Sequence, residues 1–152
     1  MTLTSARGAL SVSAHFPHDS ATTVTSVAVV DDDPFFRRSL ERLLRVLGFR
    51  VTGFESAENY LSDGRALDSA CLILDIHLGG MSGLELYDSL TALGDVPPAV
   101  FVSAVEDEEL EARIRAMRRA TFLHKPCDPQ LLAAKIRELV ASDRESKGAR
   151  IP

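Results

Sequence analysis

Short apolar runs in this sequence end in polar side chains of a few kinds. Asp31 and Asp32 follow the first run, Asp75 ends another, and Ser103 and Lys125 end two later ones. In open α/β sheets, residues at the carboxyl ends of parallel strands converge on one site. We therefore expect carboxylates, a hydroxyl and an ammonium group, far apart along the chain, to meet in one pocket.

Carboxylates held this close together need a cation. Two unit charges about 4 Å apart repel by roughly 4 kcal/mol at an effective dielectric constant of about 20. A small set of oxygen ligands favours Mg²⁺, which also offsets the charge of an incoming phosphoryl group. Lys125 would pair with a phosphoryl oxygen and Ser103 would donate its hydroxyl. Asp75 is then the expected nucleophile, forming an aspartyl phosphate.

Alternating strand and helix patterns place these residues. The apolar runs predict strands over 27–30, 49–54, 71–74, 99–102 and 121–124. Helical spacing and cap-and-start pairs such as Asp33-Pro34 and Asp128-Pro129 predict helices over 34–47, 57–61, 84–93, 106–118 and 129–141. Five βα units indicate an α/β fold, a doubly wound five-stranded parallel sheet with helices on both faces.

Composition bounds the class of protein. The 152 residues are 45% hydrophobic and 26% charged, which suits one globular domain, and the net charge of -5 gives nucleic-acid binding no electrostatic support. We expect a disordered N-terminal tail over 1–25, the domain over 26–141 and a flexible C-terminal tail over 142–152. No secretory signal or membrane span stands out, so we expect a cytoplasmic protein with Cys71 and Cys127 reduced; an organellar transit peptide is the less favoured alternative.

These motifs together resemble the receiver domains of two-component response regulators, in particular single-domain, chemotaxis-regulator-like ones. The matching pieces are Val29-Val30-Asp31-Asp32-Asp33-Pro34, Leu72-Ile73-Leu74-Asp75, Met81-Ser82-Gly83, Val102-Ser103-Ala104 and Lys125-Pro126. The resemblance covers about residues 26–141. It implies a flavodoxin-like (βα)₅ sheet with strand order 2-1-3-4-5.

The resemblance also implies a metal site. Asp31 and Asp32 would be the acidic pair, with Asp32 the preferred direct ligand of Mg²⁺. Asp75 would be both a ligand and the phosphoacceptor. The backbone carbonyl of His77 would be a further ligand.

A switch is implied as well. Ser103 would be the switch hydroxyl, Phe122 the switch aromatic and Lys125 the lysine that pairs with the phosphoryl group. Lys125-Pro126 would form a cis peptide bond, which proline permits at modest cost.

Three positions depart from the family pattern. Gly79 stands where a proline is usual, Arg119-Ala120 replaces a Gly-Ala pair, and Cys127 replaces a large apolar residue. None of these is a site residue, so they bear on the partner and on the lifetime of the phosphoryl group.

The expected function is signalling. A histidine kinase or histidine phosphotransfer protein would donate a phosphoryl group to Asp75. Because the chain ends soon after the fifth predicted helix, we expect no output domain, and output through docking to an unknown protein or onward phosphotransfer. We expect that the protein is not an enzyme and at most catalyses its own slow phosphorylation and dephosphorylation. We also expect that it binds neither nucleic acid nor membranes.

Other interpretations remain open from the sequence alone. The chain could be a phosphorylation-independent adaptor that keeps only the fold, or a phosphohydrolase of the haloacid-dehalogenase type, which generally carries an acid where this chain has His77. Asp31 and Asp32 could be helix-capping acids only. His77 and His124 are more simply surface histidines than metal ligands, and Phe35 is either exposed or half-buried.

Overall fold

The computed structural model describes residues 23–64 and 68–149, which form one five-stranded parallel sheet in the order β2-β1-β3-β4-β5. The predicted fold class and strand order are therefore confirmed. Most of the expected N-terminal tail, residues 1–22, and the last three residues lie outside the described residues.

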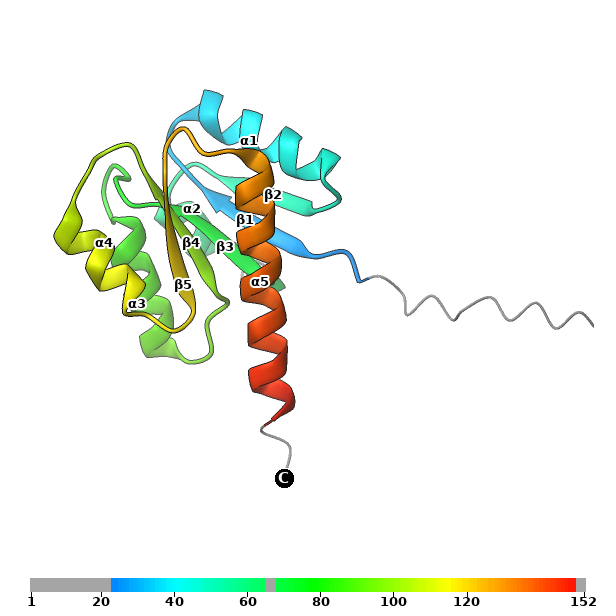
Figure 1. The fold of residues 1–152 in the computed structure, drawn as a ribbon. Helices are drawn as coiled ribbons and strands as arrows, with labels where there is room; N and C mark the ends of the chain where they lie inside the picture. Colours follow the sequence, from blue (N-terminus) through cyan, green and yellow to red (C-terminus); the bar gives the residue numbers. More distant parts are fainter. Residues whose placement is uncertain (1–22, 65–67, 150–152) are drawn as a thin grey trace, which may run out of the picture.

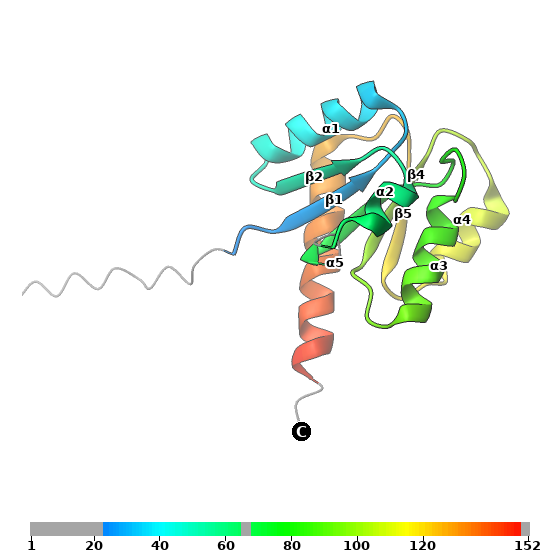
Figure 2. The ribbon, with the colours of Figure 1, turned by 180° about the vertical axis from the view of Figure 1, so that it is seen from behind.

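Helices cover both faces of the sheet. In chain order the elements are β1 Ser26–Val30, α1 Pro34–Val46, β2 Arg50–Phe54, α2 Ala57–Ser62, β3 Cys71–Asp75, α3 Gly83–Leu93, β4 Ala99–Ser103, α4 Glu108–Arg115, β5 Ala120–His124 and α5 Pro129–Gly148. Figure 1 and, from behind, Figure 2 show α1 and α5 on one face and α2, α3 and α4 on the other.

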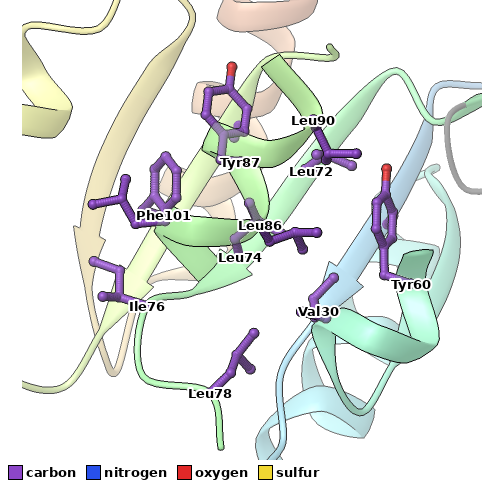
Figure 3. Packing of buried hydrophobic residues seen from close by; sticks show 14 of the residues in the cluster. Val30, Tyr60, Leu72, Leu74, Ile76, Leu78, Leu86, Tyr87, Leu90 and Phe101 are labelled. Atoms are coloured by element: carbon purple, nitrogen blue, oxygen red, sulfur yellow. The ribbon is translucent and has the colours of Figure 1, made fainter. Parts of the chain in front are cut away.

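A layer of large apolar side chains lies between the sheet and helices α2, α3 and α4 (Figure 3). Leu86 and Leu90 of α3 pack with Leu72 and Leu74 of β3, and all four are almost completely buried. The rings of Tyr87 and Phe101 meet edge-on at 5.5 Å. Burying one such side chain is worth about 1.5–3 kcal/mol. A second layer, built on Val27, Ile73 and Val100 among others, faces α1 and α5.

Two helices, α1 and α5, begin where the cap residues predict. Asp33 accepts hydrogen bonds from the backbone N–H groups of Phe35 and Phe36, and Asp128 accepts one from Gln130. Each cap satisfies donors that the first helical turn leaves free. The loops that carry site residues are therefore closed by short, local bonds.

Two helices differ from the prediction by more than one residue at an end. α4 begins at Glu108 and not at Glu106, because the side chain of Asp107 caps it through the N–H of Leu110. α5 runs to Gly148 and not to Ala141, and its added turns carry Asp143 and Lys147. Asp143 forms an ion pair with Arg119 in the loop before β5, and Lys147 forms one with Asp95 in the loop before β4. No local sequence pattern indicates these contacts. Within the described residues, no helix is long and apolar enough to cross a membrane.

Candidate functional site

The ends of β1, β3 and β4 bring three predicted site residues to one edge of the sheet. Asp31 follows β1, Asp75 ends β3 and Ser103 ends β4, and these side chains are 1%, 5% and 1% exposed. Parallel pairing of β1 with β3 and of β3 with β4 sets them side by side. Asp32, the next residue after Asp31, is exposed at the mouth of the site.

Lys125 crosses from the end of β5 to join the two buried acids. Its Nζ atom lies 2.7 Å from Oδ2 of Asp31 and 3.1 Å from Oδ2 of Asp75. The ammonium group also lies 4.2 Å from the centre of the Phe36 ring, a cation–π contact from α1. One cation thus serves two carboxylates, which leaves negative charge in excess at this edge.

The environment shifts the pKa values of the central pair of groups. Burial raises the pKa of the Asp75 carboxyl above its usual range, and the charge of Asp31 adds to this, against the opposing effect of Lys125. Burial works to lower the pKa of Lys125, but its hydrogen bonds and charge interactions with Asp31 and Asp75 outweigh this and raise it. Lys125 therefore stays charged, while the ionised form of Asp75 is stabilised less than it would be in water.

The acidic group fits a small divalent cation. Carboxylate oxygens of Asp31, Asp32 and Asp75 all lie within 4.8 Å of one another. A set of oxygen donors with excess negative charge suits a hard ion such as Mg²⁺. The N–H of His77 donates to Oδ1 of Asp75 at 3.0 Å, which holds the chain after β3 close to this group, while the His77 side chain is exposed.

Among the described residues, neither of the two predicted switch residues is hydrogen-bonded to the acids. The Oγ atom of Ser103 accepts a hydrogen bond from the N–H of Val105 at 3.1 Å. Phe122 is half-buried in β5 and packs against the apolar layer under α3 and α4. Its ring meets that of His124 edge-on at 4.8 Å. In this arrangement the Ser103 hydroxyl is engaged locally.

Two of the three departures from the family pattern, Gly79 and Cys127, lie in loops that carry site residues. Gly79 and Gly80 follow Asp75 in the loop before α3, and Gly80 has a φ of 90°, which favours glycine. The Lys125-Pro126 bond is cis, as the resemblance implies. Cys127 is partly buried against the layer under α1 and α5, and both cysteines are free.

Sequence reasoning missed contacts that support the site from α1 and α4. Arg37 donates to the main-chain carbonyl of Asp31 at 2.6 Å. Glu111, buried on α4, lies 3.1 Å from Nε2 of His124 at the end of β5. Arg37 and Glu111 sit within helical patterns that predict only solvated faces, so no local signal marks them.

Comparison with known proteins assigns the family. The model of the response regulator receiver domain matches residues 27–137. The chain belongs to this family, the phosphoacceptor modules of two-component systems.

Named relatives share this domain. Nodulation protein W of Bradyrhizobium diazoefficiens is 35% identical over 86% of this chain and 56% of its own length. The transcriptional regulatory protein FixJ of Azorhizobium caulinodans is 34% identical over 78% of this chain and 56% of its own length. The chain therefore spans about half the length of these curated relatives.

Solved structures agree on the fold. The response regulator StyR superposes with a TM-score of 0.72 at 38% identity, covering 84% of this chain and 64% of its own. The chemotaxis protein CheY4 of Vibrio cholerae superposes with a TM-score of 0.67, covering 76% of this chain and 98% of its own. At 19% identity, the second likeness concerns the fold alone.

Proposed function

We propose that Asp75 accepts a phosphoryl group from a phosphohistidine of a kinase or phosphotransfer protein. The observation that carries this proposal is the setting of Asp75, which is nearly buried at the strand ends beside Asp31 and Asp32 and bonded to Lys125. Family membership supports it independently.

The proposed reaction uses few groups of this chain. A carboxylate oxygen of Asp75 attacks phosphorus, an O–P bond forms, and the P–N bond to the donor histidine breaks with its electron pair going to nitrogen. Lys125 then exchanges its bond to Oδ2 of Asp75 for one to a phosphoryl oxygen. Asp31, Asp32, Asp75 and the carbonyl of His77 would hold Mg²⁺, which supplies compensation for the added negative charge when bound.

The proposal extends to a switch. A phosphoryl group on Asp75 offers new acceptors, and Ser103 would leave Val105 to donate to one of them. Phe122 would then turn inward and change the surface of α4 and β5. The phosphoryl mimic beryllofluoride should shift amide resonances from Ser103 to Phe122, and Ser103→Ala should reduce these shifts without preventing binding. Shifts confined to the pocket of the wild type would contradict the switch.

The proposed output is protein docking. The relatives named as transcriptional regulatory proteins are longer chains, and we do not extend regulation of transcription from them to this domain. The net charge of -5 gives DNA binding no electrostatic support. We place the domain in the cytoplasm, whose reducing conditions suit its free cysteines.

Labelling by a small phosphodonor tests the acceptor. The full chain is incubated with acetyl phosphate and Mg²⁺, and the phosphorylated form is separated on a Phos-tag gel. Asp75→Asn should abolish the shifted band. Asp95→Asn should leave it intact, because Asp95 is exposed in the loop before β4, at the opposite ends of the strands from the site. Undiminished labelling of Asp75→Asn would refute the assignment.

The same protein separates the rival functions. A fold-only adaptor would not be labelled at all. A phosphohydrolase of the haloacid-dehalogenase type would release p-nitrophenol from p-nitrophenyl phosphate over many turnovers. We expect labelling on Asp75 without such turnover.

A further inference from the structure

Three charged side chains form a row on the face of α1 that packs on β2. Arg37, Glu41 and Arg45 are four residues apart, so they lie above one another on the helix. Arg37 Nε and Arg45 Nη2 approach the Glu41 carboxylate at 3.9 and 4.0 Å. The side chains of Arg37 and Glu41 are only 14% and 16% exposed, so this is not an ordinary solvated face. The phosphoryl chemistry described above uses none of the three.

Gly53 makes room for this row. It lies in β2 two residues after Val51, and alternate residues of a strand share a face, so a side chain at position 53 would point towards α1. A Cβ atom there would lie 1.6 Å from Oε1 of Glu41 and 3.2 Å from Cδ of Arg37. Glycine inside a strand often marks a close approach of this kind. Even alanine at this position would displace the Glu41 carboxylate.

The other end of Arg37 reaches the acidic site. Its Nη1 donates to the main-chain carbonyl of Asp31 at 2.6 Å, just beyond the end of β1. Asp31 is 1% exposed, and a buried carbonyl needs a partner, which Arg37 provides. The same peptide group leads to Asp32, and no hydrogen bond between described residues holds the Asp32 side chain. The direction of Asp32 therefore depends on this peptide.

We infer that Arg37, held by Glu41 over Gly53, is a positioning residue that sets the peptide between Asp31 and Asp32 and so aims Asp32 at the metal. The inference rests on the proposed function, because the cation is part of it. Arg37 acts through Asp31 and touches no reacting atom. Loss of a partner that orients a ligand typically weakens metal binding by about tenfold or more.

Calorimetric titration of Mg²⁺ into the full chain tests this inference. Arg37→Ala removes the donor, and Gly53→Ala displaces Glu41 without changing any charge. Both should weaken Mg²⁺ affinity by about tenfold. Arg38→Ala is the matched control, since Arg38 lies exposed on the same helix, and it should stay within about twofold of the wild type.

A double-variant comparison tests whether Gly53→Ala acts through the Glu41 carboxylate. In a Glu41→Ala background there is no carboxylate for a new Cβ to displace, and its remaining contact, 3.2 Å from Cδ of the flexible Arg37 side chain, needs only a small shift. Adding Gly53→Ala should therefore change the affinity by less than about twofold. The metal-free protein supplies a second readout. Amide resonances of Asp31 and Asp32 should move in Arg37→Ala and Gly53→Ala and stay in place in Arg38→Ala, whatever the melting temperature does.

The outcomes distinguish a failure of this inference from a failure of the proposed function on which it rests. A wild type that binds Mg²⁺ and takes the phosphoryl group, with Gly53→Ala and Arg37→Ala equal to it, overturns the inference alone. A wild type that does neither overturns both. If Arg37→Ala does not fold, Gly53→Ala decides, because it keeps every charged group and replaces glycine within a strand by a residue with less freedom to lose on folding.

Discussion

The two edges of the sheet carry the same kinds of charged group in opposite settings. At the carboxyl-end edge, Asp31 and Asp75 are nearly buried and share the single ammonium group of Lys125. Asp32 adds a third negative charge at the mouth. Acids outnumber bases there, and most of the charge is shielded from water.

At the amino-end edge, acids and bases are matched. Arg119 bonds to Asp95 and Asp143, and Lys147 lies 3.2 Å from Asp95 and 3.1 Å from Asp143. The side chains of Asp95 and Lys147 are 66% and 55% exposed. The group ties the last turns of α5 to the loops before β4 and β5.

The pKa shifts of the acids follow this contrast. Burial raises the pKa of Asp75, whereas hydrogen bonds from Arg119 and Lys147 lower that of Asp95. The buried and unbalanced charge at the carboxyl-end edge opposes folding and favours binding of a cation, as is common at functional sites. The opposite edge has balanced charge, and its Asp95 and Lys147 are well exposed, so these two groups add little stability and need no ligand. The same residue types therefore acquire different roles from burial and balance.

The two lysines should respond most differently. Lys125→Met leaves Asp31 and Asp75 without a cation, so we expect a loss of about 2 kcal/mol in the free energy of unfolding. Phosphorylation by acetyl phosphate should slow by about a hundredfold. Lys147→Met should cost less than about 1 kcal/mol and leave labelling unchanged. Urea unfolding and Phos-tag time courses measure both, and equal losses for the two variants would contradict the comparison.

Adjacent acids within the carboxyl-end edge should separate function from stability. Asp32→Ala should weaken Mg²⁺ binding by about tenfold yet leave the metal-free melting temperature unchanged or raised, because a repelling charge is gone. Asp33→Ala should do the reverse, losing a helix cap worth about 1 kcal/mol and little Mg²⁺ affinity. Calorimetry and thermal melts distinguish them; a strongly destabilised Asp32→Ala would make Asp32 structural.

Neutralising the buried acceptor should stabilise the metal-free fold. The folded-state pKa of Asp75 lies above its ordinary value of 3.8, so ionisation is disfavoured by folding. The resulting loss of stability is absent below pH 3.8 and develops as pH rises through the folded-state pKa. Asp75→Asn should therefore melt a few degrees higher than the wild type in EDTA at pH 7, with the difference shrinking in acid. A lower melting temperature at pH 7 would contradict this.

The smallest effect belongs to the exposed acid. The folded-state pKa of Asp95 lies below 3.8, so its contribution to stability is present above that pH and is lost as pH falls through the folded-state pKa. Because Asp95 is well exposed, Asp95→Asn should cost under about 1 kcal/mol at pH 7, and less in high salt. Urea unfolding at two salt concentrations measures it; a salt-independent loss of several kcal/mol would show that this edge is not screened.

Much of the fold was predictable because its signals are local. The run Cys71–Leu74 reads as a buried strand, and all its residues are buried in β3. Asp33 and Asp128 bond to backbone groups two or three residues away, so their helix starts follow from the sequence. The end of α5 was not predictable, because its partner Arg119 lies in the loop before β5, 24 residues away in the sequence.

The candidate site divides in the same way. The sequence by itself determined which residue types stand at the strand ends, and parallel strands carry those ends to one edge. Only the tertiary structure decided that Lys125 bonds to Asp31, 94 residues away, and that Arg37 reaches the Asp31 carbonyl while Glu41 lies over Gly53. It also decided that Phe35 is 83% exposed. Periodicity and capping act over a few residues, whereas burial and charge partners depend on how distant segments pack.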